Sequence, residues 1–252
     1  MAKIKGFVFY KGLSQIDGSP IVGIATLHSK NSKTGDMVQT WILNDNGLSP
    51  LENIKNGADY SICGDCKHRR YTGGACYVDV GRAVMQVWRS YMKGNYPDYT
   101  LSPNYFEPLV KGREVRVGAY GDPFAIPYEV WARLLKTARK HTGYTHQWQR
   151  VDFDNRIGDI CMASVDNAQE YTQAKKEGMR TFRVLSNVEV TLKPREFICP
   201  ATPEGGDTQT CQTCCACSGT GVGSNKADVA VVVHGALKKR FTQQNVGTSD
   251  TH

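Results

Sequence analysis

The fold of this chain is indicated most clearly by one stretch of ten residues, Glu114-Val115-Arg116-Val117-Gly118-Ala119-Tyr120-Gly121-Asp122-Pro123. Its pattern predicts a β-strand over 114–119, and the glycine, acid and proline that follow predict a tight turn. Apolar residues at helical spacing then predict an amphipathic helix over 127–140. Asp122 therefore stands between a strand and a helix, where it can contact a ligand or simply cap the helix.

The same alternation of strand and helix continues toward the C-terminus. We expect strands over 144–148, 160–165, 181–185 and 229–233, and a helix over 168–176. This order predicts a parallel sheet with helices packed outside it. Parallel sheets bind ligands at the carboxyl ends of their strands, which fall here at residues 120–123, 164–167 and 234–235.

The N-terminal part of the chain has a different pattern. Short apolar stretches over 7–10, 21–26 and 37–43, separated by turn residues, predict a small antiparallel β layer. Helices are expected over 50–56, ended by Gly57, and over 81–93.

The nine cysteines are mostly gathered in two groups. No apolar signal segment begins the chain, and in a reducing cytoplasm clustered thiols indicate metal sites more than disulfides. Cys63, Cys66 and Cys76 form the first group. Three thiolates fit a [4Fe–4S] cluster with one open iron, whereas His68 as a fourth ligand would make a structural zinc site.

The second group lies in a Gly- and Thr-rich stretch over 200–226 that has little periodicity and is expected to be a metal-bound loop. Cys215 is a spare thiol, and His234 could replace one thiolate or be structural. Zinc and an iron–sulfur cluster fit this spacing equally well. The four expected ligands of this second metal centre are Cys199, Cys211, Cys214 and Cys217.

The chain is mildly basic, with a net charge of +7 and a pI near 8.9. Basic runs at 67–70 and 238–240 permit contact with nucleic acid or a phosphorylated substrate, although a solvated basic surface explains the charge as well. No stretch is long and apolar enough to span a membrane, so we expect a cytoplasmic protein with no membrane partner.

Three motifs together resemble the radical SAM superfamily over roughly residues 58–190. Cys76-Tyr77 resembles the end of its cluster loop, Gly121-Asp122-Pro123 its Gly-Glu-Pro segment, and Ser164-Val165-Asp166 a strand end that lines the substrate pocket. The pattern is most similar to phage-encoded members of unknown role, which implies a bacterial host cell. The chain departs from the family in its Cys-x2-Cys-x9-Cys spacing, where Cys-x3-Cys-x2-Cys is usual, and in Asp122, where Glu is usual.

The resemblance implies a fold, cofactors and residue roles. The fold is an α/β partial TIM-barrel-like parallel sheet with outer helices. The cluster would bind S-adenosylmethionine and, given an external reductant, cleave it to a 5′-deoxyadenosyl radical that attacks an unknown substrate, which could be a nucleic acid or nucleotide. Asp122 and Asp166 are the expected catalytic residues. The residues expected at the cofactor are Tyr77, Gly118, Gly121, Asp122, Pro123 and Ser164.

Two other functions stay open at this point. Asp122 and Asp166 could be nucleophile and base in a zinc-containing, barrel-like transglycosylase that exchanges nucleic-acid bases. The chain could also be a non-enzymatic zinc protein that binds nucleic acid. The expected division of the chain is an N-terminal β layer over 1–57, a core over 58–198, a Cys-rich loop with the final strand over 199–241, and a disordered tail over 242–252.

Overall fold

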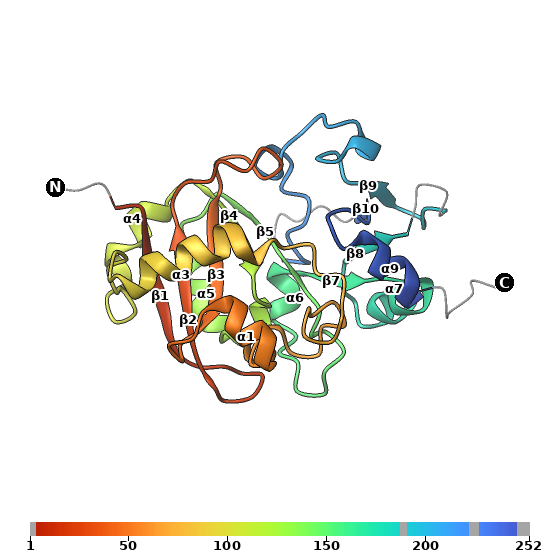
Figure 1. Cartoon of the computed structure of the whole chain (residues 1–252). Coiled ribbons are helices and arrows are strands. Elements are labelled where there is room, and N and C mark those ends of the chain that lie inside the picture. Colours follow the sequence, from red (N-terminus) through yellow and green to blue (C-terminus); the bar gives the residue numbers. More distant parts are fainter. Residues whose placement is uncertain (1–3, 187–190, 222–226, 246–252) are drawn as a thin grey trace.

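The computed structural model describes residues 4–186, 191–221 and 227–245. These form a mixed α/β protein with two five-stranded sheets that lie beside each other (Figure 1). Sheet A contains, in spatial order, β1 (Gly6–Leu13), β2 (Pro20–Thr26), β3 (Val38–Asn44), β4 (Glu114–Tyr120) and β5 (Lys140–Thr142). Sheet B contains β6 (Tyr144–Thr145), β7 (Met162–Val165), β8 (Thr181–Leu185), β10 (Asp228–Val232) and β9 (Glu196–Ile198).

Sheet A combines both kinds of strand pairing. β1, β2 and β3 pair antiparallel, as the sequence predicts for the N-terminal layer. β3 then pairs parallel with β4, and β4 pairs parallel with β5. The predicted N-terminal layer is therefore continuous with the strands that follow it.

Sheet B is parallel throughout. β5 and β6 are separated by Gly143 alone, so one extended segment leaves sheet A and enters sheet B. A side chain at residue 143 would begin 2.8 Å from the sulfur of Cys161 and 3.1 Å from Cβ of Val117. Glycine permits this close packing where the sheets meet.

Helices connect and cover the strands, and α3 runs across sheet A (Figure 1). α1 begins at a capping box, in which Ser49 and Glu52 bond to each other's backbone amides, and it ends at Gly57 with φ 82°. A π-helical turn, Val80–Val84, leads directly into α3. The α-helices are α1 (Pro50–Asn56), α2 (Tyr60–Cys63), α3 (Met85–Met92), α4 (Glu107–Val110), α5 (Tyr128–Leu135), α6 (Ile157–Ile160), α7 (Ala168–Lys176), α8 (Cys211–Cys214) and α9 (Lys238–Asn245).

The main apolar core packs against sheet A. Phe7, Ile24, Val115 and Leu134 are among its buried side chains, and Trp131 donates a 2.8 Å hydrogen bond to the carbonyl of Pro123. Sheet B has two much smaller apolar clusters. The consequence is that much of the buried interior around sheet B consists of polar and charged side chains.

The structure corrects several of the expected elements. The strand expected over 144–148 ends at Thr145, and the strand expected over 160–165 begins at Met162, because residues 157–160 form α6. The helix predicted over 127–140 ends at Leu135, because the backbone of Thr137 and Arg139 bonds to Gly112 and Arg113 and leads into β5. The disordered tail expected over 242–252 is wrong for residues 242–245, which belong to α9; residues 246–252 lie outside the described part of the chain. Across the described ranges, no helix has the length and apolar character needed to cross a membrane.

Candidate functional site

A cavity of about 200 Å³ lies against both sheets. A water molecule needs only about 10–15 Å³ of such space, so the cavity has room for a ligand. Alternate residues of the strands line the cavity, which places them on one face, and on β4 Ala119 also lines it. One face of β4, β5, β6, β8 and β10 therefore borders the same cavity, through Arg116, Gly118, Tyr120, Thr142, Tyr144, Phe182, Val184, Val231 and, just after β10, Val233.

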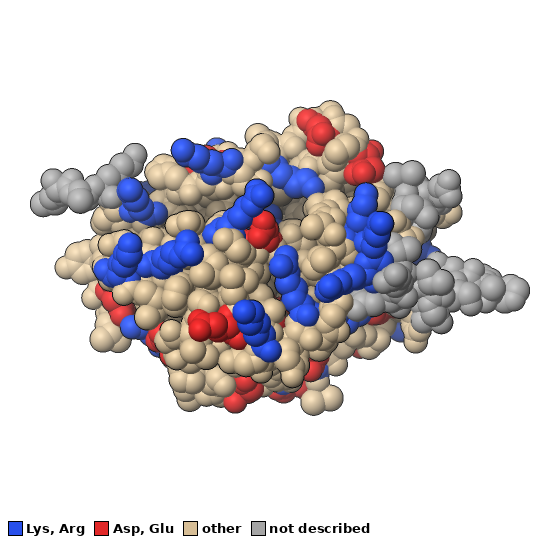
Figure 2. Space-filling view, in the orientation of Figure 1, with Lys and Arg blue, Asp and Glu red and all other residues tan. Residues whose placement is uncertain are grey.

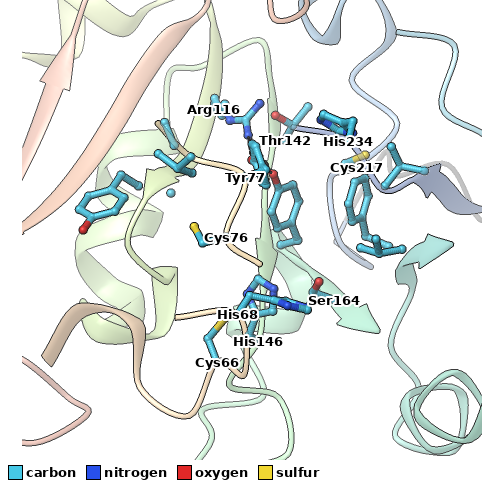
Figure 3. Close-up of a pocket in the computed structure, with 18 of the residues that line it drawn as sticks. Cys66, His68, Cys76, Tyr77, Arg116, Thr142, His146, Ser164, Cys217 and His234 are labelled. Atoms are coloured by element: carbon cyan, nitrogen blue, oxygen red, sulfur yellow. Dashed lines mark hydrogen bonds between the residues drawn. The ribbon is translucent and has the colours of Figure 1, made fainter. Parts of the chain in front are cut away.

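Cys63, Cys66 and Cys76 all line this cavity, as Figure 3 shows for the last two. Burial raises the pKa of Cys63 well above its ordinary value, and the neighbouring thiolates of Cys66 and Cys76 raise it further. Burial also raises the pKa of Cys76, and repulsion from the Cys66 thiolate raises it further. The structure thus brings the three predicted ligands close enough to repel one another when ionised.

The loop that carries these cysteines is held by Gln147, which is fully buried. Its amide nitrogen donates to the carbonyl of Cys63 at 2.9 Å, and its amide oxygen accepts from the backbone of Asp65 at 3.0 Å. A side chain on Gly64 would meet that oxygen at 2.2 Å, and the φ of Gly64 is 52°. Only glycine fits this turn between the first two cysteines.

Asp166 holds the same loop from the end of β7. Its Oδ2 accepts hydrogen bonds from His68 Nε2 at 2.7 Å and from Lys67 Nζ at 2.8 Å. Burial alone would raise the pKa of Asp166, but His68 and Lys67 outweigh it and lower the pKa below its ordinary value. Asp166 is therefore directed at the cysteine loop and is not among the residues that line the cavity.

Asp122 lines the cavity but is held by three donors of its own chain. Its Oδ1 accepts from the Thr145 hydroxyl at 2.7 Å and the Phe124 amide at 3.1 Å, and its Oδ2 accepts from the His146 amide at 2.7 Å. The Phe124 bond caps a short 3-10 turn, Pro123–Ala125. The capping role considered for Asp122 is thus present in the structure, and the same bonds fix the end of β6 beside the turn.

His146 is a site residue that the sequence left ambiguous. It lines the cavity with Cys66, and its Nδ1 lies 3.7 Å from Asp122 Oδ2. Burial would lower the pKa of His146, but Cys66 and Asp122 raise it well above its ordinary value. His68, the expected fourth zinc ligand, instead bonds to Asp166, and its ring stacks 5.5 Å from that of Phe241 in α9.

The second cysteine group borders the opposite part of the cavity, where Figure 3 shows Cys217. Burial raises the pKa of Cys217 well above its ordinary value, and Cys199, Cys211 and Cys214 raise it further. Cys199, Cys211 and Cys217 line the cavity, whereas Cys214 lies behind them in α8. The four predicted ligands are therefore near one another.

Backbone bonds tie this second loop to sheet A and to the junction of the sheets. The Cys211 amide donates to the carbonyl of Lys33 at 3.0 Å, and the Gly143 amide donates to the carbonyl of Cys217 at 2.8 Å. Cys215 adopts a φ of 49° and directs its thiol to the Cys211 carbonyl at 3.2 Å. Cys161 is fully buried and does not line the cavity.

Arg116 lies beside Tyr77 in the wall of the cavity (Figure 3). Its Nη2 donates to the hydroxyl of Tyr77 at 2.6 Å and to that of Tyr144 at 2.8 Å, and the two hydroxyls bond to each other. Tyr144 is stacked on Phe182 with ring centroids 4.6 Å apart. These contacts give Arg116 a fixed place in the wall of the cavity.

Lys33 and His234 lie at the same end of the cavity. Lys33 Nζ is 3.3 Å from His234 Nε2, and His234 Nδ1 is 3.1 Å from the carbonyl of Val232. The ring of His234 is 5.6 Å from that of Tyr77. His234 therefore contacts a lysine and an aromatic ring in this structure.

The basic run at 67–70 is largely engaged inside the protein. Lys67 pairs with Asp166 and Glu170, Arg69 pairs with Asp59, and Arg70 donates to the Val78 carbonyl at 2.6 Å. In the second basic run, Arg240 of α9 reaches the Gly73 carbonyl at 3.5 Å. Both runs thus contribute to holding the first cysteine loop.

The chemistry of the two thiol groups fits metal binding. Thiolates are the metal-binding form of cysteine, and a bound cation would oppose both the burial and the mutual repulsion that raise the pKa of Cys63 and Cys217. Within residues 4–186, 191–221 and 227–245, no three His, Cys, Asp or Glu side chains are spaced as donors to one metal ion. Comparison with known proteins found no matching family model, no similar curated protein and no similar solved structure.

Proposed function

We propose that this protein is a radical SAM-type enzyme that acts on a substrate held in the cavity. The observation that supports it is the convergence of three motifs far apart in sequence. The Cys63 group with Tyr77, the Gly121-Asp122-Pro123 turn and Ser164 all contribute to the walls of one cavity, with the exception of Pro123, which lies just behind. The motifs were expected to meet at the carboxyl ends of parallel strands.

In this proposal Cys63, Cys66 and Cys76 hold a [4Fe–4S] cluster that binds S-adenosylmethionine. The cluster and S-adenosylmethionine, once both are bound and an external donor has reduced the cluster, would supply the radical chemistry. Gly118 and Gly121, with φ of 68° and 81°, line the cavity at the end of β4, and a Cβ on Gly121 would lie 2.6 Å from Cβ of Ile42, so this tight turn needs glycine. Asp122 keeps one acceptor position free for the cofactor amine beyond its three internal bonds.

The proposal extends to the fold. One face of successive parallel strands, from β4 through β10, borders the cavity, as expected of strands that curve into a partial barrel. The reducing cytoplasm of a bacterial host, where exposed thiols stay reduced, is the compartment that suits this chemistry.

Asp166 has a positioning role in this scheme. Because its carboxylate bonds to Lys67 and His68, it fixes the residues directly after Cys66. A second metal centre at Cys199, Cys211, Cys214 and Cys217 would be structural or would pass electrons. Iron–sulfur and zinc remain the two candidates for this second centre.

One observation keeps zinc a candidate at the first group. His146 lines the same cavity as Cys63, Cys66 and Cys76, so one nitrogen and three sulfurs border it, and these donors would have to move closer together to hold one ion. The transglycosylase reading receives less support, since Asp122 and Asp166 are both engaged by internal donors. Metal content therefore decides between an enzyme with an open cluster and a zinc protein.

The test is anaerobic purification, or reconstitution with iron and sulfide, followed by metal analysis and a visible spectrum. We expect about four irons at the first group, and S-adenosylmethionine cleavage after reduction with dithionite. Cys76→Ala should abolish cleavage and lower the iron content. Cys161→Ala is the matched control, because Cys161 is buried away from the cavity, and it should keep both.

Colourless protein with stoichiometric zinc that His146→Ala reduces would replace this proposal with the zinc reading. Reconstituted brown protein that never cleaves S-adenosylmethionine would also contradict it.

A further inference from the structure

The cavity carries basic side chains with little acid to balance them. Its basic lining residues are Lys33, His68, Arg116, His146 and His234. Among the described residues, Asp122 is the one acidic side chain in the lining, and three donors already occupy it. Apart from the cysteines, the lining therefore presents two permanent cations, Lys33 and Arg116, against one carboxylate.

Arg116, which is half-buried, differs from Arg183 and Arg69 in what it bonds to. Arg183 forms two hydrogen bonds with the carboxylate of Glu196, and Arg69 pairs with Asp59. In the described parts of the chain, Arg116 has no carboxylate partner, and its bonds to tyrosine hydroxyls use Nη2 alone. Nε and Nη1 remain free to donate to a ligand in the cavity.

The side chains of Arg116 and Lys33 are both held in place by their neighbours. Tyr77 and Tyr144 fix Nη2 of Arg116, and the stacking of Tyr144 on Phe182 fixes that tyrosine in turn. His234 donates from Nδ1 to the Val232 carbonyl, which leaves Nε2 to accept from Lys33. An arginine and a lysine are thus presented to the cavity with little freedom left to lose on binding.

We propose that Arg116 and Lys33 bind a phosphate group of the substrate, an inference that rests on the proposed function by naming the substrate class of the same cavity. An arginine fork with a free edge matches the oxygens of phosphate, and a second cation balances its second charge. The surrounding surface agrees, because Lys and Arg side chains lie on several sides of the hollow in this face (Figure 2).

The experiment measures the binding of inorganic phosphate to the protein as purified, by titration calorimetry at low ionic strength. Arg116→Gln should weaken binding by about tenfold or more, because a charged hydrogen-bonding partner is lost. Lys33→Met should weaken it several-fold. Arg156→Gln is the control, since Arg156 pairs with Asp154 and Glu129 on the exposed surface and should bind like wild type.

Circular dichroism and metal content accompany each titration. Lys33 contributes only a half-exposed side chain, so Lys33→Met keeps the test valid if Arg116→Gln does not fold. Competition then identifies the source of the phosphate: a nucleoside monophosphate that displaces it indicates a small substrate, and a short oligonucleotide that displaces it indicates a nucleic-acid backbone.

Equal phosphate binding by wild type, Arg116→Gln and Lys33→Met, or no binding by wild type, would overturn the inference. So would loss of metal in Arg116→Gln with phosphate binding unchanged, which would make Arg116 a counter-charge for Cys211 and Cys217. No S-adenosylmethionine or reductant is present in the titration. Phosphate binding without cofactor cleavage would therefore reject the enzyme proposal alone.

Discussion

The parts of the molecule around the two sheets are stabilised by different interactions. Sheet A packs on a large apolar core that includes Phe7, Ile24 and Trp131. Sheet B has small apolar clusters and a set of buried charges instead, among them Arg183 with Glu196 and Lys175 with Asp228. Arg180 is also buried there and donates to the carbonyls of Ala216, Gly219 and Ala227.

This difference has a structural reason and a consequence. Several strands of sheet B are short, and the second cysteine group beside them packs against an apolar cluster of only three buried residues, Met162, Ala216 and Val229. Buried ion pairs stabilise such a region little in net terms, but they fix one arrangement, because an unpaired buried charge is costly. The sheet-B half should therefore respond strongly to the loss of one charge and weakly to the loss of both.

Replacing Glu196 tests that expectation with the largest effect. The side chains of Arg183 and Glu196 are 4% and 0% exposed, so Glu196→Gln leaves a buried guanidinium unpaired and should lower the free energy of unfolding by about 3–5 kcal/mol. Urea denaturation measures this loss. The double variant Arg183→Met with Glu196→Leu should regain most of it; a double variant as unstable as the single one would mean that the pair itself supplies the stability.

Leu134→Ala probes the sheet-A core. Leu134 is 1% exposed in α5, and truncation should cost about 3 kcal/mol through lost apolar contacts and a cavity. Hydrogen exchange should speed up mainly in β1 to β3 for this variant and mainly in β8 to β10 for Glu196→Gln. The same exchange pattern in both variants would show that the two halves unfold as one unit and that sheets A and B do not differ in local stability.

Asp166→Asn tests the contact between β7 and the first cysteine loop. We expect a loss of about 2 kcal/mol at neutral pH, because His68 and Lys67 keep their places but lose a charged acceptor. The folded-state pKa of Asp166 is lowered, so its contribution is present above the unfolded pKa, near 3.8, and is lost as pH falls through the lower folded value.

Urea denaturation of wild type and Asp166→Asn between pH 3 and pH 7 measures this dependence. The difference between the two proteins should shrink as the pH falls below about 4. Glu204→Gln, at an exposed site, is the control and should follow wild type at every pH. A difference that is independent of pH would exclude the carboxylate charge as its cause.

Local sequence patterns predicted much of the fold. The strand over 181–185 and the helix over 168–176 have the expected bounds, because each begins and ends at local signals such as Asn167 and Gly178. The helix expected over 127–140 was too long, since its amphipathic pattern continues past Leu135 while pairing of β5 with β4 takes over the backbone. β9 was missed because three residues form a strand only through their partner β10.

The candidate site was predictable where its residues are chemically distinctive. The clustered cysteines and the Gly-Asp-Pro turn could be found in the sequence, and the structure gathers them around one cavity. Arg116 and Tyr144 were not singled out and His146 was left ambiguous, because a basic or aromatic residue on a strand is common. The sequence held a weak signal for Arg116. It stands between Val115 and Val117 in a strand, so its side chain lies on the face opposite to the two valines.

The contact at Gly143 limits how this cavity can differ in related chains. Cβ of any other residue at position 143 would lie 2.8 Å from the Cys161 sulfur. The two sheets therefore have no room for a side chain where they meet. A larger ligand could bind only if wall residues such as Phe182 or Val231 were replaced by smaller ones. Differences in ligand size between related chains should therefore come from substitutions of those wall residues, while the distance between the two sheets stays the same.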